Sequence, residues 1–467
     1  MYAPADTPRS SPTRATDLFA RVTRIPLVVS LLALQLPLIL NPGYFSHDEL
    51  QWWARADVPS WSALPWIPWL DLSPLQYRPL TFNLWLVLAH ACAATPWLMH
   101  LVFVALGTAN AWLLARALAG AGAPPRTRYV AAAVFALSPY VVYVHGWTAT
   151  LADLLTLASL LLAVRLIQHA DATQSAATDA LRALGAALLV ALALLCKESA
   201  LVFPALLAFA AYGQPSSRRT RIAVVFSTIV VIAYLALRLP ILLDSAAAGP
   251  AYAWSPRNIA PRTIEYLLYP FTPPLFEIAP LFAVGLARLA AAAACVALLL
   301  HALGTRGWRW PIAWLAAVIA ALAPVLVLPI AYDHYAYLAS AAGIAIAAAA
   351  WPMLRPRPRA VLLILAAIVL AHGAAVMSRM VAAGVVERNL HADLLDVVQD
   401  DPRTPIVVAA ADARDAWLLQ RLLHEVDRYR GVSLLNVRSA AERAGAAPGA
   451  RRLAMDRHGH LAAVPGT

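Results

Sequence analysis

The amino-acid sequence predicts an all-α protein that crosses a membrane many times. Of its 467 residues, 61% are hydrophobic and 13% are charged, whereas a soluble domain carries about 25% charged residues. Mostly apolar runs recur along the chain, and many reach the length of about 17 to 25 residues that spans a bilayer. Both observations favour a polytopic membrane protein over a large soluble helical protein.

The distribution of arginine indicates which apolar runs cross the membrane. Apolar runs lie at 26–43, 80–94, 97–119, 129–145, 150–168, 181–196, 199–213, 222–243, 279–303, 311–330, 335–351 and 360–378. If the run at 80–94 lies at the interface, the inner segments hold 17 arginines and the outer loops before the tail hold five cationic residues. This bias follows the positive-inside rule and predicts about 11 transmembrane helices, with the N-terminus inside and the C-terminus outside. The net charge of +11 thus reflects topology and does not indicate a nucleic-acid partner.

This topology divides the chain into three parts. They are a cytoplasmic N-terminal segment at 1–25, a transmembrane domain at 26–379 and a small outer domain at 380–467. The first outer loop, at 44–96, is crowded with tryptophan near its start, so we expect interfacial helices in it. The second outer loop, at 244–278, contains many prolines and is expected to be irregular.

The C-terminal tail differs in character from the rest of the chain. Its charge density is higher, and β-like runs at 404–409 and 432–437 flank a helical pattern at 416–429. We expect a small α/β domain with a loose end rich in Ala, Gly and Arg. His391 and His424 are expected to be surface residues of its helices.

Ionisable residues at the outer helix ends are the candidates for chemistry, because charges near a membrane are costly and tend to mark function. Lys197 is the single lysine of the chain, beside 35 arginines. A compact ammonium suits a phosphate oxygen, although an ion pair with Glu198 or Asp153 is an alternative role. Arg78 could clamp a phosphate with two hydrogen bonds or extend toward the interface.

Carboxylates form the second group of candidates. Adjacent Asp48 and Glu49 follow the first span, where an outer carboxylate could act as a general base, best with a pKa raised by partial burial; an ordinary acidic loop is the alternative. His47 beside them leaves a divalent metal possible, with no certain cofactor. Asp153 lies within a span and needs a partner, either Lys197 or His145.

Five short motifs, in order over residues 44–340, resemble those of class C (GT-C fold) membrane glycosyltransferases. The acidic first-loop motif is similar to Tyr44-Phe45-Ser46-His47-Asp48-Glu49-Leu50, and the motif that opens the interfacial helix is similar to Tyr77-Arg78-Pro79-Leu80-Thr81. Within that superfamily the protein O-mannosyltransferase and aminoarabinose transferase group is closest, especially the transmembrane-and-TPR mannosyltransferases. Their motifs resemble Trp147 with Ala152-Asp153-Leu154-Leu155, Lys197-Glu198-Ser199-Ala200-Leu201, and Asp333-His334-Tyr335-Ala336-Tyr337-Leu338. His334 stands where the family has Arg, and TPR repeats are absent from the sequence.

The resemblance implies a GT-C-like bundle that transfers a sugar, with inversion, from a polyprenyl-phosphate donor to a glycan, lipid or protein acceptor. The residues fit this chemistry, because a single displacement needs one base, which Asp48 or Glu49 can supply, and a departing phosphate needs positive charge, which Lys197 and Arg78 can supply. We prefer Asp48 as the base, with Glu49 positioning the acceptor or supporting the loop. The remaining residues expected to bind substrate are His47, Tyr77, His145, Trp147, Asp153, Glu198, Asp333, His334, Tyr335 and Tyr337.

Two other classes of function remain open at this level. A polytopic transporter or flippase also buries charges, although it usually places them near the bilayer midplane and often has internal repeats. A surface-polysaccharide polymerase or ligase would use a lipid-linked glycan. Abundant Ala and Arg with a single Lys are typical of a GC-rich bacterial gene, which predicts an inner-membrane protein whose site and C-terminus face the periplasm.

Overall fold

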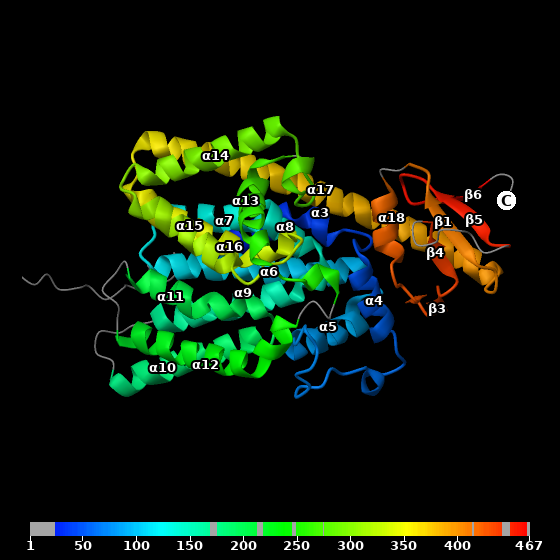
Figure 1. The fold of residues 1–467 in the computed structure, drawn as a ribbon, viewed down its shortest axis with the longest axis horizontal. Coiled ribbons are helices and arrows are strands. Elements are labelled where there is room, and N and C mark those ends of the chain that lie inside the picture. The colour runs from blue at the N-terminus through cyan, green and yellow to red at the C-terminus, as the bar shows by residue number, and fades with distance from the viewer. Residues whose placement is uncertain are drawn as a thin grey trace, which may run out of the picture.

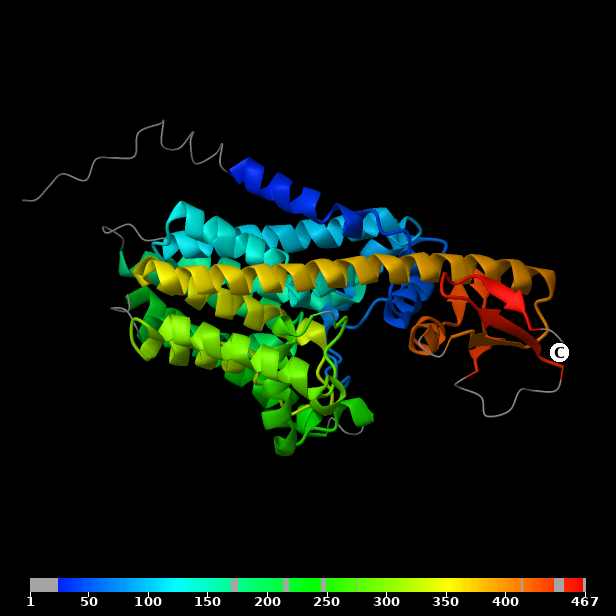
Figure 2. The same ribbon diagram turned by 90° about the horizontal axis from the view of Figure 1, so that it is seen from above.

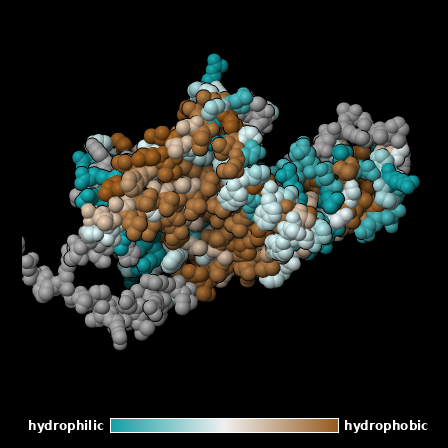
Figure 3. Space-filling model, turned by 90° about the horizontal axis from the view of Figure 1, so that it is seen from below, coloured by the Kyte–Doolittle hydropathy of each residue, from teal (hydrophilic) through white to brown (hydrophobic). Residues whose placement is uncertain are grey.

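The computed structural model describes residues 24–168, 175–212, 218–244, 249–273, 275–412, 415–440 and 449–464. The chain is mostly helical, and its helices lie side by side in a bundle, with a small sheet domain at one end (Figure 1). Apolar side chains cover much of the side of the bundle, and polar side chains gather toward its two ends (Figure 3). This surface is that of a protein whose helices span a membrane.

Seven helices of the described residues are long and apolar enough to cross a membrane. They are α6 (Pro96–Gly120), η2 with α9 (Thr148–Gln168), α10 (Ala176–Leu194), α12 (Arg218–Leu243), α14 (Leu286–Gly304), η9 with α16 and η10 (Asp333–Met353), and α17 (Pro356–Asp400). A bent pair, α7 (Pro125–Ala136) and α8 (Pro139–Gly146), adds an eighth span if its two halves, 59° apart, are taken together.

Several of the apolar runs form helices shorter than expected. The first run is divided into α2 (Arg24–Leu34) and α3 (Leu36–Ile39), with Pro37 at the start of α3. The run at 199–213 begins with the 3-10 helix η3 (Glu198–Val202) before α11 (Phe203–Tyr212). The run at 311–330 is helical only over α15 (Arg309–Leu322), because Pro324 and Pro329 follow. The total of eleven spans therefore stays a prediction.

The first outer loop contains two helices, α4 (His47–Ala56) and α5 (Pro79–Cys92), with the short η1 (Trp61–Ala63) between them. A capping box starts α4: the Ser46 hydroxyl caps its first backbone N–H groups, and the Glu49 carboxylate accepts from the backbone of Ser46. Pro79 opens α5, where proline costs no backbone hydrogen bond.

The second outer loop is less irregular than its prolines suggested. It contains α13 (Ile259–Leu268), preceded by η5 (Pro250–Tyr252) and η6 (Pro256–Asn258) and followed by η7 (Tyr269–Phe271) and η8 (Leu281–Ala283). One regular helix forms in this loop because Pro261 lies in the first turn of α13 and Pro270 lies just beyond its end. Both are positions that a helix tolerates.

The outer domain is joined to the bundle by α17, a continuous helix of 45 residues that runs through the expected boundary at 380 (Figure 2). Its other elements are β1 (Ile406–Ala410), α18 (Ala416–Leu423), β2 (Arg428–Tyr429), β3 (Val432–Ser433), β4 (Val437–Ser439), β5 (Arg451–Met455) and β6 (Leu461–Ala463). The main sheet has the order β4-β1-β5-β6, with β1 parallel to β4 and β5, and β6 antiparallel to β5.

Two expectations about the tail are wrong. The C-terminal end is not uniformly loose, because β5 alternates and buries Leu453 and Met455 against the central strand β1; residues 441–448 lie outside the described part. His391 is not a surface residue. It is fully buried on α17, stacks on Tyr429 with ring centroids 4.4 Å apart and lies 3.1 Å from the Glu387 carboxylate.

Candidate functional site

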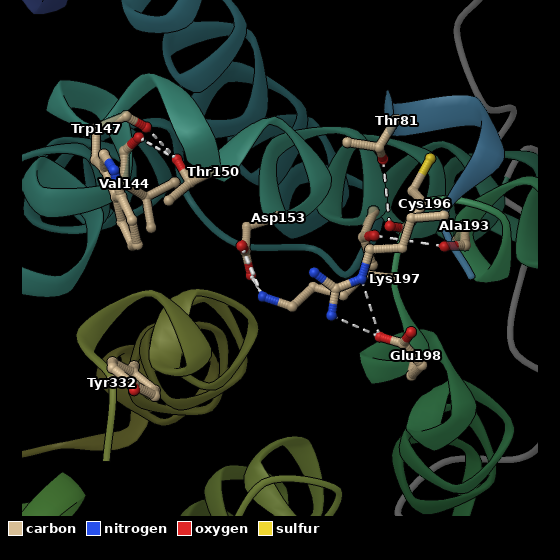
Figure 4. Close-up of polar contacts among 12 residues, drawn as sticks. Thr81, Val144, Trp147, Thr150, Asp153, Ala193, Cys196, Lys197, Glu198 and Tyr332 are labelled. Atoms are coloured by element: carbon tan, nitrogen blue, oxygen red, sulfur yellow. Dashed lines mark hydrogen bonds and ion pairs between the residues drawn. The ribbon is translucent and has the colours of Figure 1, made fainter. Parts of the chain in front are cut away.

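Two ion pairs lie together where the first outer loop meets the turns before α9 and after α10 (Figure 4). The Lys197 ammonium donates to both Asp153 oxygens, at 2.6 and 2.7 Å, and these side chains are only 3% and 7% exposed. Arg78 donates from Nε (3.2 Å) and Nη2 (2.8 Å) to one Glu198 oxygen. The expectation that Asp153 requires a buried partner is confirmed, and the partner is Lys197.

Local backbone contacts hold these residues in place. The turn after α10 is closed by the Lys197 N–H, which donates to the Ala193 carbonyl at 2.8 Å. Thr81, in the first turn of α5, donates its hydroxyl to the Cys196 carbonyl at 3.2 Å (Figure 4). The start of α5, which follows Arg78, is therefore attached to the turn that carries Lys197.

Aromatic rings of η9 (Asp333–Ala336) border the ion pairs. The Lys197 ammonium lies 4.8 Å from the centre of the Tyr335 ring, within the range of a cation–π contact. The His334 ring is 4.3 Å from the Tyr335 ring and 5.1 Å from the Trp147 ring, measured between centroids. The cations are thus linked through aromatic contacts to the turn between α8 and α9.

Glu49 is buried and fully engaged. One of its oxygens accepts from the backbone N–H groups of Phe45 (2.6 Å) and Ser46 (3.0 Å), and the other accepts from the N–H (2.6 Å) and hydroxyl (2.8 Å) of Thr148. Burial raises the pKa of Glu49 to about 7, although these hydrogen bonds oppose the rise. Of the two roles expected for Glu49, these contacts fit support of the first outer loop.

Asp48, in contrast, is open to solvent, with its side chain 42% exposed. It accepts from the Ser46 hydroxyl at 3.3 Å and lies 3.6 Å from His47 Nε2. Burial lowers the pKa of His47, with the Asp48 carboxylate opposing the shift, so His47 is mainly neutral at pH 7. Asp48 is therefore the carboxylate of the pair that a substrate can reach.

Tyr332 lies near charged groups of the site. Burial and the nearby Tyr252 raise the pKa of Tyr332. The Asp48 carboxylate adds to this rise and the Arg421 guanidinium opposes it, so both charges act on Tyr332. Tyr332 directly precedes Asp333, which is buried and accepts from the Ile278 N–H at 3.2 Å.

Three of the predicted substrate-binding residues have partners away from the ion pairs. His145 and Tyr337 are buried inside the bundle: His145 lies 2.6 Å from the Gln35 side-chain oxygen and 3.3 Å from the Tyr337 hydroxyl, which accepts from Asn110 at 3.1 Å. Tyr77 donates to the Trp69 carbonyl at 2.7 Å. These contacts are those of packing and loop support.

Arg421, which lies on α18 of the outer domain, was not identified from the sequence. Its guanidinium donates to Glu277 (2.8 Å) and to the Tyr143 hydroxyl (3.2 Å) and lies 4.1 Å from the centre of the Phe45 ring. In the sequence it is one of the two arginines of the helical pattern at 416–429, and only the docking of the domain brings it to the bundle.

Some buried polar atoms of the site lack a hydrogen-bond partner within the described residues. They are Trp147 Nε1, His334 Nδ1, Glu198 Oε1 and Arg421 Nε. Such atoms are rare in folded proteins and call for an explanation, such as a ligand or water. For the possible metal, the described part of the chain contains no group of three or more His, Cys, Asp or Glu side chains that could hold an ion.

An apolar cavity of about 390 Å³ lies between α7, α13, α14, α15, α16 and α17. Near one end it is lined by Arg126 and Trp351, which flank the inner ends of their helices in the predicted topology, and near the other by Tyr140 and Tyr266. Ala336, the last residue of η9, also lines it. The lining is almost wholly apolar, so the cavity suits a hydrocarbon chain.

The arrangement combines cations that can bind an anionic group, an accessible carboxylate and a space for an apolar tail. No family model, no curated protein and no solved structure matches this chain.

Proposed function

We propose that this protein is a membrane glycosyltransferase that moves a sugar from a polyprenyl-phosphate donor to an acceptor hydroxyl on the outer side of the membrane. The observation that carries the proposal is the position of η9. Tyr335 on this short helix contacts the Lys197 ammonium, and Ala336, the next residue, lines the apolar cavity. A lipid phosphate with its tail in the cavity would place its head group beside η9 and the cations.

Lys197 and Arg78 would stabilise the departing phosphate. Phosphate leaves as an anion, so the reaction needs positive charge at this point more than a proton donor. Both cations are now paired with carboxylates, so the donor phosphate would have to take over part of the hydrogen bonding of Asp153 and Glu198.

Asp48 would act as general base. The acceptor oxygen attacks the anomeric carbon, the bond from that carbon to the phosphate oxygen breaks, and the acceptor proton passes to the Asp48 carboxylate. One displacement of this kind inverts the anomeric centre. The eleven-span topology, with the site in the periplasm of a bacterial inner membrane, is part of the same proposal, as is a glycan, lipid or protein acceptor.

The test is transfer of radiolabelled sugar from polyprenyl-phosphate donors in membranes that contain the wild type, Asp48→Asn or Lys197→Ala. Asp71→Asn is the matched control, since Asp71 lies on the same outer loop and is bound by its neighbour Ser73. We expect a loss of at least about 100-fold in Asp48→Asn, in the range of general-base catalysis, and no loss in the control.

The outcomes separate the classes of function. Folded Asp48→Asn protein that transfers sugar at the wild-type rate would remove Asp48 as the base. If wild-type protein moves a lipid-linked sugar from one leaflet of a vesicle membrane to the other and forms no transfer product, the result would favour a flippase. Transfer of a whole glycan, with no transfer of a single sugar, would indicate a polymerase or ligase.

A further inference from the structure

Arg421 reaches the membrane site from the outer domain. Besides its bonds to Glu277 and Tyr143, its guanidinium lies 5.5 Å from the centre of the Trp147 ring. The side chain is 20% exposed.

The outer domain is docked so that Arg421 is held there. His47 Nδ1, on α4, is 3.1 Å from the Arg421 carbonyl oxygen, and this contact requires the Nδ1–H to donate. One turn further along α4, the Gln51 amide donates to the His424 carbonyl at 3.2 Å. Thus both ends of the last turn of α18 are attached to the helix that carries Asp48.

Around Arg421 the structure leaves nitrogen atoms without partners. Arg421 Nε, Trp147 Nε1 and His334 Nδ1 are buried and have no hydrogen-bond partner in the described part of the chain. Their side chains are neighbours, since the Trp147 ring is 5.5 Å from the Arg421 guanidinium and 5.1 Å from the His334 ring. Two of the three atoms can only donate, so the missing partner must supply oxygen acceptors.

We infer that Arg421, Trp147 and His334 form a subsite for the hydroxyl groups of the transferred sugar, which the outer domain completes. This inference rests on the proposed function. A sugar ring offers several oxygen acceptors, which are the partners that Trp147 Nε1 and Arg421 Nε lack. The donor phosphate is assigned to Lys197 and Arg78, so the subsite should distinguish a sugar-bearing carrier from a bare one.

The experiment measures binding of polyprenyl phosphate and of polyprenyl-phosphate glucose, mannose and galactose to the full chain in lipid nanodiscs. Wild-type protein should bind at least one sugar-bearing carrier more tightly than bare polyprenyl phosphate. Arg421→Gln and Trp147→Phe should each reduce this preference about tenfold, as loss of a buried hydrogen bond predicts. Their affinity for bare polyprenyl phosphate should stay within about twofold of wild type.

Trp147→Phe keeps an aromatic ring and removes the indole N–H together with the five-membered ring, so it tests the N–H donor if Arg421→Gln does not fold. Arg430→Gln is the control, because Arg430 lies in the same domain but contacts the rings of Trp53 and Tyr429; it should keep the full preference. Variants that keep the preference, or that bind both carriers equally weakly, overturn the inference and leave the proposed function standing. A wild type that binds no carrier overturns both.

Discussion

The presence of a buried ion pair requires an explanation, because removing two charges from water costs several kcal/mol and their mutual attraction offsets only part of that cost. Lys197 and Asp153 are such a pair, almost completely buried at one end of the bundle. Two apolar side chains would fill the same space without that cost. The retention of an ammonium here, in a chain that uses arginine at every other basic position, fits a charge that is needed for binding.

Substitutions of Lys197 and Asp153 should therefore affect stability and activity differently. Lys197→Met alone leaves the Asp153 carboxylate unpaired and should destabilise the protein by about 3 to 5 kcal/mol. The double variant Lys197→Met with Asp153→Leu should recover most of that stability, yet stay inactive in sugar transfer. Thermal unfolding in detergent and the transfer assay measure the two effects; an active double variant would make the pair purely structural.

Glu49 gives a prediction on pH. Its pKa in the folded protein is about 7, raised by burial from an ordinary value of 4.5, so the folded state binds this proton more tightly than the unfolded state. Its contribution to stability is therefore greatest below pH 4.5 and decreases as the pH rises to about 7, by at most about 3 kcal/mol.

The measurement is the unfolding temperature of wild type and Glu49→Gln between pH 4.5 and 8. The wild type should lose more stability than Glu49→Gln over the range from pH 4.5 to 7, because the amide does not titrate. Parallel curves for the two proteins would contradict the shifted pKa.

At the scale of helices, composition and proline position predict different things. Apolar length identified the long spans well, because a helix such as α6 or α12 needs only a continuous apolar stretch. It did not reveal the 59° bend between α7 and α8, which lies just before Pro139. It also did not reveal the helix α13, which has Pro261 in its first turn. In the tail, the strand β1 followed from its apolar run, whereas β5 was hidden by its two arginines.

The contacts of the site could be predicted only for residues whose chemistry requires a particular kind of partner. A carboxylate at the position of Asp153 is costly without a partner, so the sequence predicted one, either Lys197 or His145; the structure shows that it is Lys197. Arg421 had no such requirement, and its position depends on how the outer domain docks on α4. Likewise, the burial of His145 could not be read from its place near a helix end.

Arg238, on α12, positions a segment of the first outer loop. It is fully buried in α12, and its guanidinium donates to the carbonyls of Leu72, Pro74 (2.6 Å) and Leu75 (2.7 Å) in the first outer loop. It also lies 5.3 Å from the Tyr77 ring. Because Arg78 follows Tyr77 directly, Arg238 holds the segment that presents Arg78 to Glu198.

Arg238→Leu should therefore release this segment. We expect faster hydrogen exchange at residues 72–78, a lower unfolding temperature, and a weaker affinity for bare polyprenyl phosphate. Arg288→Leu is the matched control: Arg288 also interrupts an apolar run, but it is exposed on α14 and should change none of the three. Unchanged exchange at 72–78 in Arg238→Leu would show that other contacts hold the loop.

On the scale of the whole molecule, one helix joins the two functional regions. α17 lines the apolar cavity with Leu362, Leu365 and Val369 and then continues into the outer domain that carries Arg421 (Figure 2). The bundle would hold the lipid tail, and the domain at its end would contact the sugar. A continuous helix keeps these two regions at a fixed distance, which is what recognition of both ends of one donor requires.

The cavity itself gives the last prediction. Ala347→Trp adds a large ring to the cavity wall on α16, so it should weaken binding of a long-chain polyprenyl phosphate by about tenfold or more, since each CH₂ group kept from burial costs about 0.8 kcal/mol. A carrier with only two isoprene units should bind wild type and variant alike, because its tail ends before the obstruction. Ala293→Trp on the exposed face of α14 is the control and should leave both affinities unchanged. If Ala347→Trp changes the affinity of neither carrier, the tail lies elsewhere and the cavity no longer supports a lipid-linked donor. If it weakens the binding of both carriers equally, the substitution has disturbed the head-group site. The dependence on chain length that identifies a tail-binding cavity would then be absent.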